Sequence, residues 1–245
     1  MRVLKLTLAY DGTNYVGWQR QDNGVSIQQI VEDALQPMCG DDPVVVNGAS
    51  RTDAGVHAFA QAASVRVAFA HTPSTVRRAL NVRLPADVRV LDVEEAAPRF
   101  HARFDATGKS YRYRIATARV PSPFDRWFVW HMPRRYDLDA MRTAASVLIG
   151  RHDFSSFQAR GASVLDGWRT LERIEIARAD DEIHIDVDGN GFLRHMVRII
   201  VGTLVDIGVG TRPVTSMADT LAAKDRQAAG QTAPATGLVL TSVKY

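Results

Sequence analysis

The segment Asn47–Gln61, with the sequence NGASRTDAGVHAFAQ, constrains the fold of this chain more than any other feature. A short β-branched run, Pro43–Asn47, leads into it, and the alternating stretch Ala62–Phe69 leaves it. These patterns predict two strands joined by a loop. The loop holds a lone carboxylate, Asp53, beside the guanidinium of Arg51. A carboxylate beside an arginine is typical of a catalytic group. However, Asp and Thr before a glycine are also ordinary turn and helix-capping residues.

Further periodic segments divide the chain into two halves of mixed α/β (α+β) character. In the first half, Ser26 and Gln29 form a capping-box pattern that starts a helix, and Gly40 ends it. The other elements expected there are strands at Val3–Ala9 and Val88–Glu95 and a short helix around Ser74–Leu80. We therefore expect one domain at residues 1–105 and a second at residues 106–245, with mainly antiparallel strands.

The second half repeats this mixture without repeating the sequence. Asp137 and Gly150 mark the start and the end of a helix over Asp137–Ile149. The remaining expected elements are strands at Ser110–Thr117, Leu171–Ala177, Glu182–Asp188 and Leu238–Lys244, a loop with aromatic anchors at Pro121–Pro133 and a long helix at Phe192–Ile207. Asp180 and Asp181 should join two of these strands as a hairpin.

Composition narrows the class of protein. The chain has 245 residues, of which 46% are hydrophobic and 23% charged, as is usual for a soluble globular protein with a sizeable core. The single cysteine, Cys39, excludes an internal disulfide and fits a reducing cytoplasm; its helical context predicts a buried thiol. The N-terminus is too polar for a signal peptide, and Arg198 and Asp206 interrupt the most apolar stretch. We expect a soluble, intracellular protein without a membrane span.

Read as a whole, the segment Arg51–Ala58, RTDAGVHA, resembles the catalytic loop of the tRNA pseudouridine synthases, specifically their A family. Six other segments resemble that family in the same order: Tyr10–Gln21, Phe100–Ile115, Pro121–Pro133, His152–Gln158, Gly189–Leu204 and Ala235–Tyr245. Two places depart from the family pattern. Ser50 stands where a glycine is more usual, and Asp166–Trp168 replaces a segment that more often contains proline. Neither departure removes a reacting group.

The resemblance implies an architecture and a reaction. The fold would be two related α/β domains whose sheets join into one extended sheet, with helices on one side, an RNA cleft on the other, and a homodimer as the assembly. The reaction would convert uridine to pseudouridine at tRNA positions 38, 39 and 40, in the anticodon stem-loop. Because isomerisation needs no redox agent or energy source, and the sequence contains no Walker or dinucleotide-binding loop, no cofactor and no metal are expected.

Asp53 is the candidate nucleophile, because a nearby arginine favours the ionised carboxylate. Arg198 lies in an apolar helical segment, where a charge should be paired; the alternative is an arginine that extends to solvent at the helix edge. The family resemblance pairs Arg198 with Asp53.

Tyr111 is the candidate surface for stacking on the uracil. Tyr111 and Tyr113 share one face of their predicted strand, so alternation does not distinguish them, and a buried structural tyrosine is the commoner case. The resemblance selects Tyr111, and it also makes Leu238 an apolar wall of the uracil pocket. From composition alone, Leu238 is a core residue.

Two further residues of the loop have competing interpretations. By resemblance, Arg51 contacts the RNA backbone and helps to hold the flipped nucleotide, but it could equally cap nearby carbonyls. His57 and Asp53 could suggest a metal pair, but a metal site needs at least three protein ligands and no third is identifiable. We interpret His57 as a structural histidine.

A basic and aromatic composition supports RNA as the partner. Six basic residues and only one acid, Asp105, lie between Arg99 and Arg119, with Phe100 and Phe104 among them. Further basic groups lie at Arg77, Arg78 and Arg83 and at Arg134 and Arg135, and Trp127 and Trp130 lie nearby in sequence. Each group taken singly is more often a solvated surface. Two alternatives to a synthase remain: an RNA-binding protein without catalysis, and a metal-dependent hydrolase that uses Asp53 and His57.

Overall fold

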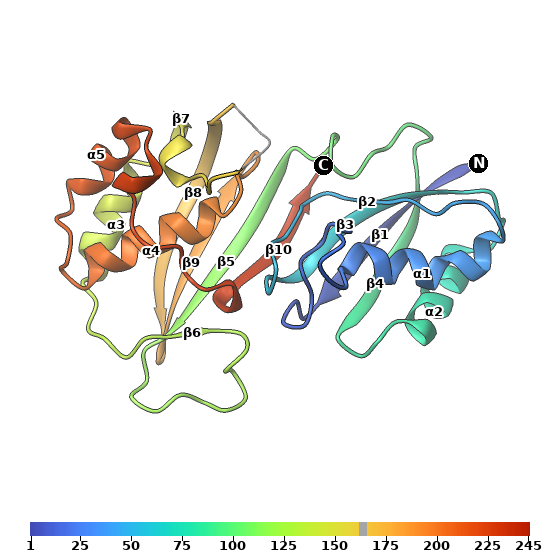
Figure 1. Cartoon of the computed structure of the whole chain (residues 1–245), viewed down its shortest axis with the longest axis horizontal. Helices are drawn as coiled ribbons and strands as arrows, with labels where there is room; N and C mark the ends of the chain where they lie inside the picture. The colour runs from blue at the N-terminus through green and yellow to red at the C-terminus, as the bar shows by residue number, and fades with distance from the viewer. Residues whose placement is uncertain (162–165) are drawn as a thin grey trace. The chain divides into compact units, whose positions relative to one another are not determined.

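The computed structural model describes residues 1–161 and 166–245, which form two compact units (Figure 1). Unit 1 comprises Met1–Thr107 and Leu240–Tyr245, and unit 2 comprises Gly108–Val239. Both units combine helices with sheets whose strands pair mainly antiparallel, which confirms the predicted α/β (α+β) class. No helix in the described part of the chain is long and apolar enough to cross a bilayer.

Unit 1 is built on a sheet with the strand order β4–β1–β3–β10, and β2 pairs with β3. Its strands are β1 (Arg2–Tyr10), β2 (Val46–Gly48), β3 (His57–Val67), β4 (Val88–Ala96) and β10 (Leu238–Lys244). Leu4, Leu6 and Leu8 alternate along β1 and are fully buried. They belong to the buried core of unit 1. The helices α1 (Ile27–Cys39) and α2 (Pro73–Arg83) cover one face of its sheet (Figure 1).

The predicted start and end of α1 are confirmed. The hydroxyl of Ser26 accepts a hydrogen bond from the Gln29 N–H at 3.2 Å, and Gly40 follows the helix with a φ of 63°. Cys39 is only partly buried, so the prediction of a buried thiol was too strong. Burial and the charge of Asp42 raise the pKa of this thiol, which makes it a poor nucleophile.

Unit 2 has the strand order β5–β9–β8–β7, and the short β6 runs parallel to β5. The strands are β5 (Gly108–Ala116), β6 (Trp130–His131), β7 (Gly150–Asp153), β8 (Trp168–Ala179) and β9 (Glu182–Gly189). The helices are α3 (Leu138–Ser146), α4 (Met196–Gly208) and α5 (Ser216–Ala223). The predicted cap of Asp137 on α3 is confirmed by its bond from the Ala140 N–H at 2.9 Å. The predicted hairpin is also confirmed, with Asp180 in the left-handed turn between β8 and β9.

Three predicted boundaries differ clearly from those of the structure, and two elements were not predicted. The strand β3 begins at His57 rather than Ala62, because small residues on both of its faces hid the alternation. The helix α4 begins at Met196 rather than Phe192, because His195 has a left-handed φ of 60°. The helix α3 ends at Ser146 rather than Ile149, in two successive turns with hydrogen bonds between residues three apart. The strand β7 and the helix α5 were not predicted.

The loop before α3 also differs from expectation. Among its predicted aromatic anchors, Trp130 packs inward: its ring lies edge-on to that of Tyr113, with centroids 6.2 Å apart. Phe124 is 87% exposed and Trp127 is 46% exposed, so neither anchors the loop.

Candidate active site

The predicted catalytic loop is fixed to a second segment of unit 1. Asp53 forms an isolated β-bridge with Gly17, and the N–H of Trp18 donates to the carbonyl of Thr52 at 3.0 Å. Gly17 has a φ of 107°, and a Cβ there would lie 2.6 Å from the Thr52 oxygen. Only glycine therefore allows these two backbones to approach so closely.

Buried side chains hold the start of the same loop. Gln61 is fully buried; its amide oxygen accepts from the Ser50 N–H at 3.1 Å, and its amide nitrogen donates to the Ser50 carbonyl at 2.7 Å. The Tyr10 hydroxyl lies 2.8 Å from the Thr52 hydroxyl. Ser50, the departure from the family pattern, is thus a buried residue whose backbone is bound on both sides. Sequence reasoning identified neither Gln61 nor Tyr10 as a support of the loop.

Within this scaffold, Asp53 is half-buried and Arg51 is exposed. The carbonyl of Asp53 accepts from the Val56 N–H at 3.1 Å, so Asp53 begins a turn, as the ordinary interpretation of Asp before Gly requires. The turn and the proposed chemistry are compatible, because the turn uses the backbone of Asp53. Shielding of part of its side chain lowers the pKa of Arg51, and the nearby charge of Arg103 lowers it further.

His57 is buried within unit 1, next to the loop Asp11–Thr13. Its Nδ1 lies 3.1 Å from the backbone nitrogen of Gly12 and 3.1 Å from an oxygen of Asp11. Among the residues that the structure describes, no three His, Cys, Asp or Glu side chains gather as a metal site requires. The surroundings of His57 are those of a structural residue.

Unit 2 carries the other three predicted site residues, Tyr111, Arg198 and Leu238. Arg198 contacts the segment 233–238, which ends at Leu238. The Nε of half-buried Arg198, on α4, donates to the Ala233 carbonyl at 2.8 Å, and the Ala233 N–H donates to the Arg198 carbonyl at 3.0 Å. Arg198 is therefore held by the backbone rather than extended to solvent. The same segment leads to Leu238, which is buried at the start of β10.

The two candidate tyrosines on β5 have different surroundings. Tyr113 is fully buried, and its hydroxyl donates to the Pro234 carbonyl at 2.7 Å. Burial raises the pKa of Tyr113, against the opposing effect of Arg198. A Cβ at Gly237 would lie 2.6 Å from the Tyr113 ring, so Tyr113 packs directly under the segment that carries Leu238. Tyr113 thus has a structural role in unit 2.

Tyr111 is also buried, but it meets a different neighbour. Its ring lies edge-to-face with that of Phe192, with centroids 5.1 Å apart. Phe192 belongs to the segment before α4, and sequence reasoning missed it because the helix was expected to begin there. The left-handed His195 is the local reason why Phe192 is outside the helix.

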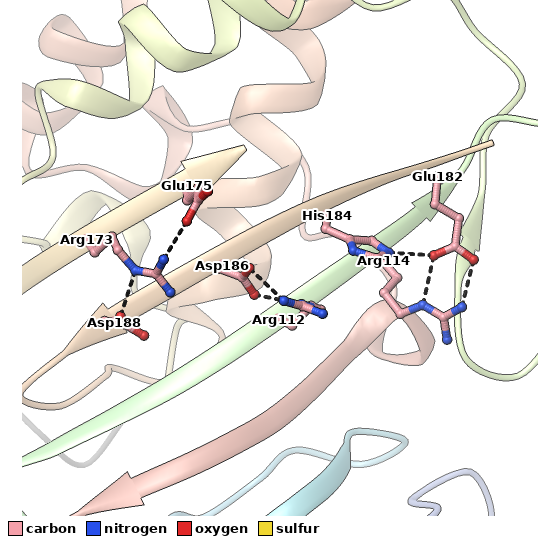
Figure 2. Close-up of polar contacts among 8 residues, drawn as sticks. All are labelled: Arg112, Arg114, Arg173, Glu175, Glu182, His184, Asp186 and Asp188. Atoms are coloured by element: carbon pink, nitrogen blue, oxygen red, sulfur yellow. Dashed lines mark hydrogen bonds and ion pairs between the residues drawn. The ribbon is translucent and has the colours of Figure 1, made fainter. Parts of the chain in front are cut away.

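The opposite face of the unit 2 sheet carries charged side chains, which we call the ion-pair ladder (Figure 2). Arg112 binds Asp186 through two hydrogen bonds of 2.8 and 2.9 Å, and Arg114 binds Glu182 through two of 2.9 and 2.7 Å. The other members are Arg173, Glu175, His184 and Asp188 (Figure 2). The predicted alternation of β5, with tyrosines on one face and arginines on the other, is confirmed.

Comparison with known proteins identifies the family. A family model described as tRNA pseudouridine synthase matches residues 7–105 and 144–245. A tRNA pseudouridine synthase A from Syntrophotalea carbinolica is 45% identical over 245 residues, which cover 100% of this chain and 97% of that protein. Proteins of the same name from Rhodospirillum centenum and a Geobacillus species are 46% and 42% identical; the matches cover 100% and 99% of this chain and 100% and 98% of those proteins.

A solved Cbf5–Nop10–Gar1 complex aligns with 97% of this chain and 48% of its own chain, at 11% identity and a TM-score of 0.39. That likeness is too distant to add to the argument. The full-length relatives and the family model are sufficient: this chain is a member of the tRNA pseudouridine synthase family.

Proposed function

We propose that this isomerase converts uridine to pseudouridine in the anticodon stem-loop of tRNA, at positions 38, 39 and 40, with Asp53 as the nucleophile. The observation that carries the proposal is the fixed position of Asp53 on a loop bonded to Gly17 and Trp18, in a chain of this family. A reacting group gains from such a scaffold, because catalysis depends on holding it in place.

The reaction is an isomerisation that balances without another reagent. The bond between uracil N1 and ribose C1′ breaks, the base rotates, and a bond between C5 and C1′ forms. The proton on C5 leaves and N1 gains one. No electrons are exchanged with a partner, so no cofactor is required.

Each remaining predicted residue has a role in this proposal. The guanidinium of Arg198 pairs with Asp53 and keeps its carboxylate ionised, while its Nε donates to the Ala233 carbonyl and so holds the side chain in place. Tyr111 stacks on the uracil, and Leu238 forms an apolar wall of the pocket. Arg51 binds the RNA backbone and holds the extruded nucleotide, whose unstacking costs a few kcal/mol.

Two further properties of the protein are its oligomeric state and its location in the cell. We propose a homodimer, as the family resemblance implies, which sedimentation equilibrium would test by the molar mass in solution. A cytoplasmic location suits the tRNA substrate and the single cysteine of the chain.

Release of tritium from tRNA labelled at uridine C5 tests the reaction, with EDTA present and the modified positions mapped afterwards. The proposal expects release together with pseudouridine at positions 38, 39 or 40. Tight tRNA binding without release would favour an RNA-binding protein without catalysis. Release that EDTA abolishes would favour the metal-dependent alternative, and pseudouridine at other positions would overturn the assignment of the substrate.

A further inference from the structure

A second segment of unit 1, Phe100–Asp105, lies beside the Arg51 loop and is fixed at Ala102. Ala102 is fully buried and belongs to one core cluster with Ala49 and Ala62. Its N–H donates to the Ser64 hydroxyl at 3.0 Å, and its carbonyl accepts from the hydroxyl of Tyr245 at 2.9 Å. The backbone at Ala102 is therefore held from both sides, and the position of its neighbours in the chain is fixed with it.

The side chains on either side of Ala102 remain accessible. The rings of His101 and Phe104 lie with their centroids 4.3 Å apart, and the guanidinium carbon of Arg103 lies 5.7 Å from the centre of the Phe104 ring. The N–H of Arg103 donates to Nδ1 of His101 at 3.1 Å, which fixes the imidazole. Phe104 nevertheless leaves 75% of its surface exposed. This side chain is held in place by its neighbours without being buried by them.

The packing of Ala102 against Ala49 also brings two arginines of like charge together. Arg51 follows Ala49 by two residues and Arg103 follows Ala102 by one, and the charge of Arg103 acts on Arg51. In the described part of unit 1, Arg2, Lys5 and Arg20 each form an ion pair with a carboxylate. Asp105, the nearest acid in sequence, accepts a hydrogen bond from the His101 N–H at 2.8 Å.

Two cations held side by side repel each other, and an anion bound between them would relieve that repulsion. A phosphate group suits this arrangement, because guanidinium groups bind its oxygens in a bidentate geometry. An aromatic ring beside the phosphate site suits a nucleobase that is not stacked in a helix. Together these features match one nucleotide of single-stranded or unstacked RNA.

We propose that Arg51, His101, Arg103 and Phe104 form a nucleotide subsite, which we call the basic–aromatic cluster. Arg51 and Arg103 bind one phosphate of the tRNA close to the target uridine, and Phe104, supported by His101, stacks on an unpaired base beside it. The inference rests on the proposed function, because it assigns a further part of the same RNA substrate to residues of unit 1.

The test measures tRNA binding at several salt concentrations for Arg103→Ala and Phe104→Ala. Arg178→Ala and Phe124→Ala are the matched controls, since Arg178 is an exposed arginine on β8 and Phe124 is 87% exposed. Phe104→Trp keeps an aromatic surface. Circular dichroism and melting curves identify any variant that fails to fold, and single-turnover rates at saturating tRNA separate binding from chemistry.

We expect Arg103→Ala to weaken binding and to reduce the slope of log affinity against log salt by about 0.7–0.9, as for one lost phosphate contact. Phe104→Ala should weaken binding about 5- to 100-fold with little change in that slope, and Phe104→Trp should restore it. In both alanine variants the single-turnover rate at saturating tRNA should fall by a smaller factor than the affinity does. The controls should bind as wild type does.

Folded Arg103→Ala and Phe104→Ala variants that bind tRNA with the wild-type affinity and salt slope would overturn the subsite. Equal losses in the two controls would also overturn it, because the effect would then belong to any exposed charge or ring. Failure of the proposed function is a separate result: wild type would form no pseudouridine, whereas the effects of the cluster on RNA binding would persist.

Discussion

The basic–aromatic cluster of unit 1 and the ion-pair ladder of unit 2 are both rich in arginine. They differ in the charge that lies next to each arginine: a carboxylate in the ladder and a second guanidinium in the cluster. In the ladder, Arg112 and Arg114 are each bound by two hydrogen bonds to a carboxylate on β9 (Figure 2). In the cluster, the charge that acts on Arg51 is that of a second arginine, Arg103. An RNA phosphate that binds Arg112 or Arg114 would have to displace the carboxylate of Asp186 or Glu182. A phosphate that binds Arg51 and Arg103 would instead reduce the repulsion between the two guanidinium groups.

This difference shows why a count of basic residues overstates the surface that RNA can use. Arg103, Arg112 and Arg114 all lie in the basic stretch between Arg99 and Arg119. The acids that neutralise two of them are Asp186 and Glu182, which are 74 and 68 residues away in the sequence. Only the pairing of β5 with β9 brings them together.

Gln61→Leu should produce the largest effect on stability, because the loop that holds Arg51 depends on this buried amide. The variant removes two hydrogen bonds to the backbone of Ser50, and we expect a loss of about 2–4 kcal/mol in the free energy of unfolding. Urea denaturation measures it. Gln36→Leu is the control, since this half-exposed glutamine donates to two carbonyls beyond α1 near the surface, and its replacement should cost less than about 1 kcal/mol. Equal losses in the two variants would mean that Gln61 is not a specific support.

Asp186→Asn should make Arg112 more available to RNA, because it removes the negative charge that Arg112 binds in the ladder. Without the carboxylate, Arg112 keeps its charge but loses its strongest partner, so unfolding should cost about 1–2 kcal/mol less, and tRNA should bind about two- to threefold more tightly at low salt. Filter binding and thermal melting measure the two effects. Arg112→Gln is the control and should leave tRNA affinity unchanged. A loss of affinity in Arg112→Gln as large as in Arg103→Ala would contradict the contrast between the two regions.

Glu182→Gln should have the smallest effect, and that effect should depend on pH. Burial alone would raise the pKa of Glu182, but hydrogen bonds from Arg114 and His184 outweigh it and hold the pKa below its usual value. A carboxylate with a lowered pKa stabilises the fold above its unfolded pKa, about 4.3, and this contribution is lost as the pH falls through the folded value. We expect wild type to exceed the variant by about 1 kcal/mol at pH 7 and to converge with it below pH ~4. A difference that persists at low pH would mean that the charge is not the cause.

The sequence predicted the fold class and most elements, because their signals are local. The cap of Ser26, the alternation along β5 and the turn at Asp180 each depend on residues close in the chain. The start of α4 could not be predicted in the same way, because its apolar periodicity continues through Phe192 and conceals the left-handed His195. The strand β3 was predicted too short because alanines on both faces carry no alternation.

For the candidate site too, the sequence identified some residues and not others. The motif directed attention to Asp53, Arg51, Tyr111, Arg198 and Leu238, which the structure places in two units and whose roles stay predictions. The supports of these residues were not visible in the sequence. Gln61 contacts Ser50, Ala233 contacts Arg198, and Tyr113 contacts Pro234 through bonds that only the folded chain creates. A local pattern cannot reveal a partner that is 35 or 121 residues away.

A direct comparison of wild type with Asp53→Asn tests the central claim, that Asp53 carries out the isomerisation. The measurement is single-turnover tritium release from C5-labelled tRNA, with tRNA affinity determined separately. We predict that Asp53→Asn binds tRNA within about threefold of wild type but releases tritium at least about 10⁴-fold more slowly, because loss of a nucleophile removes the chemical step. Release at a rate close to that of wild type by the folded variant would contradict it.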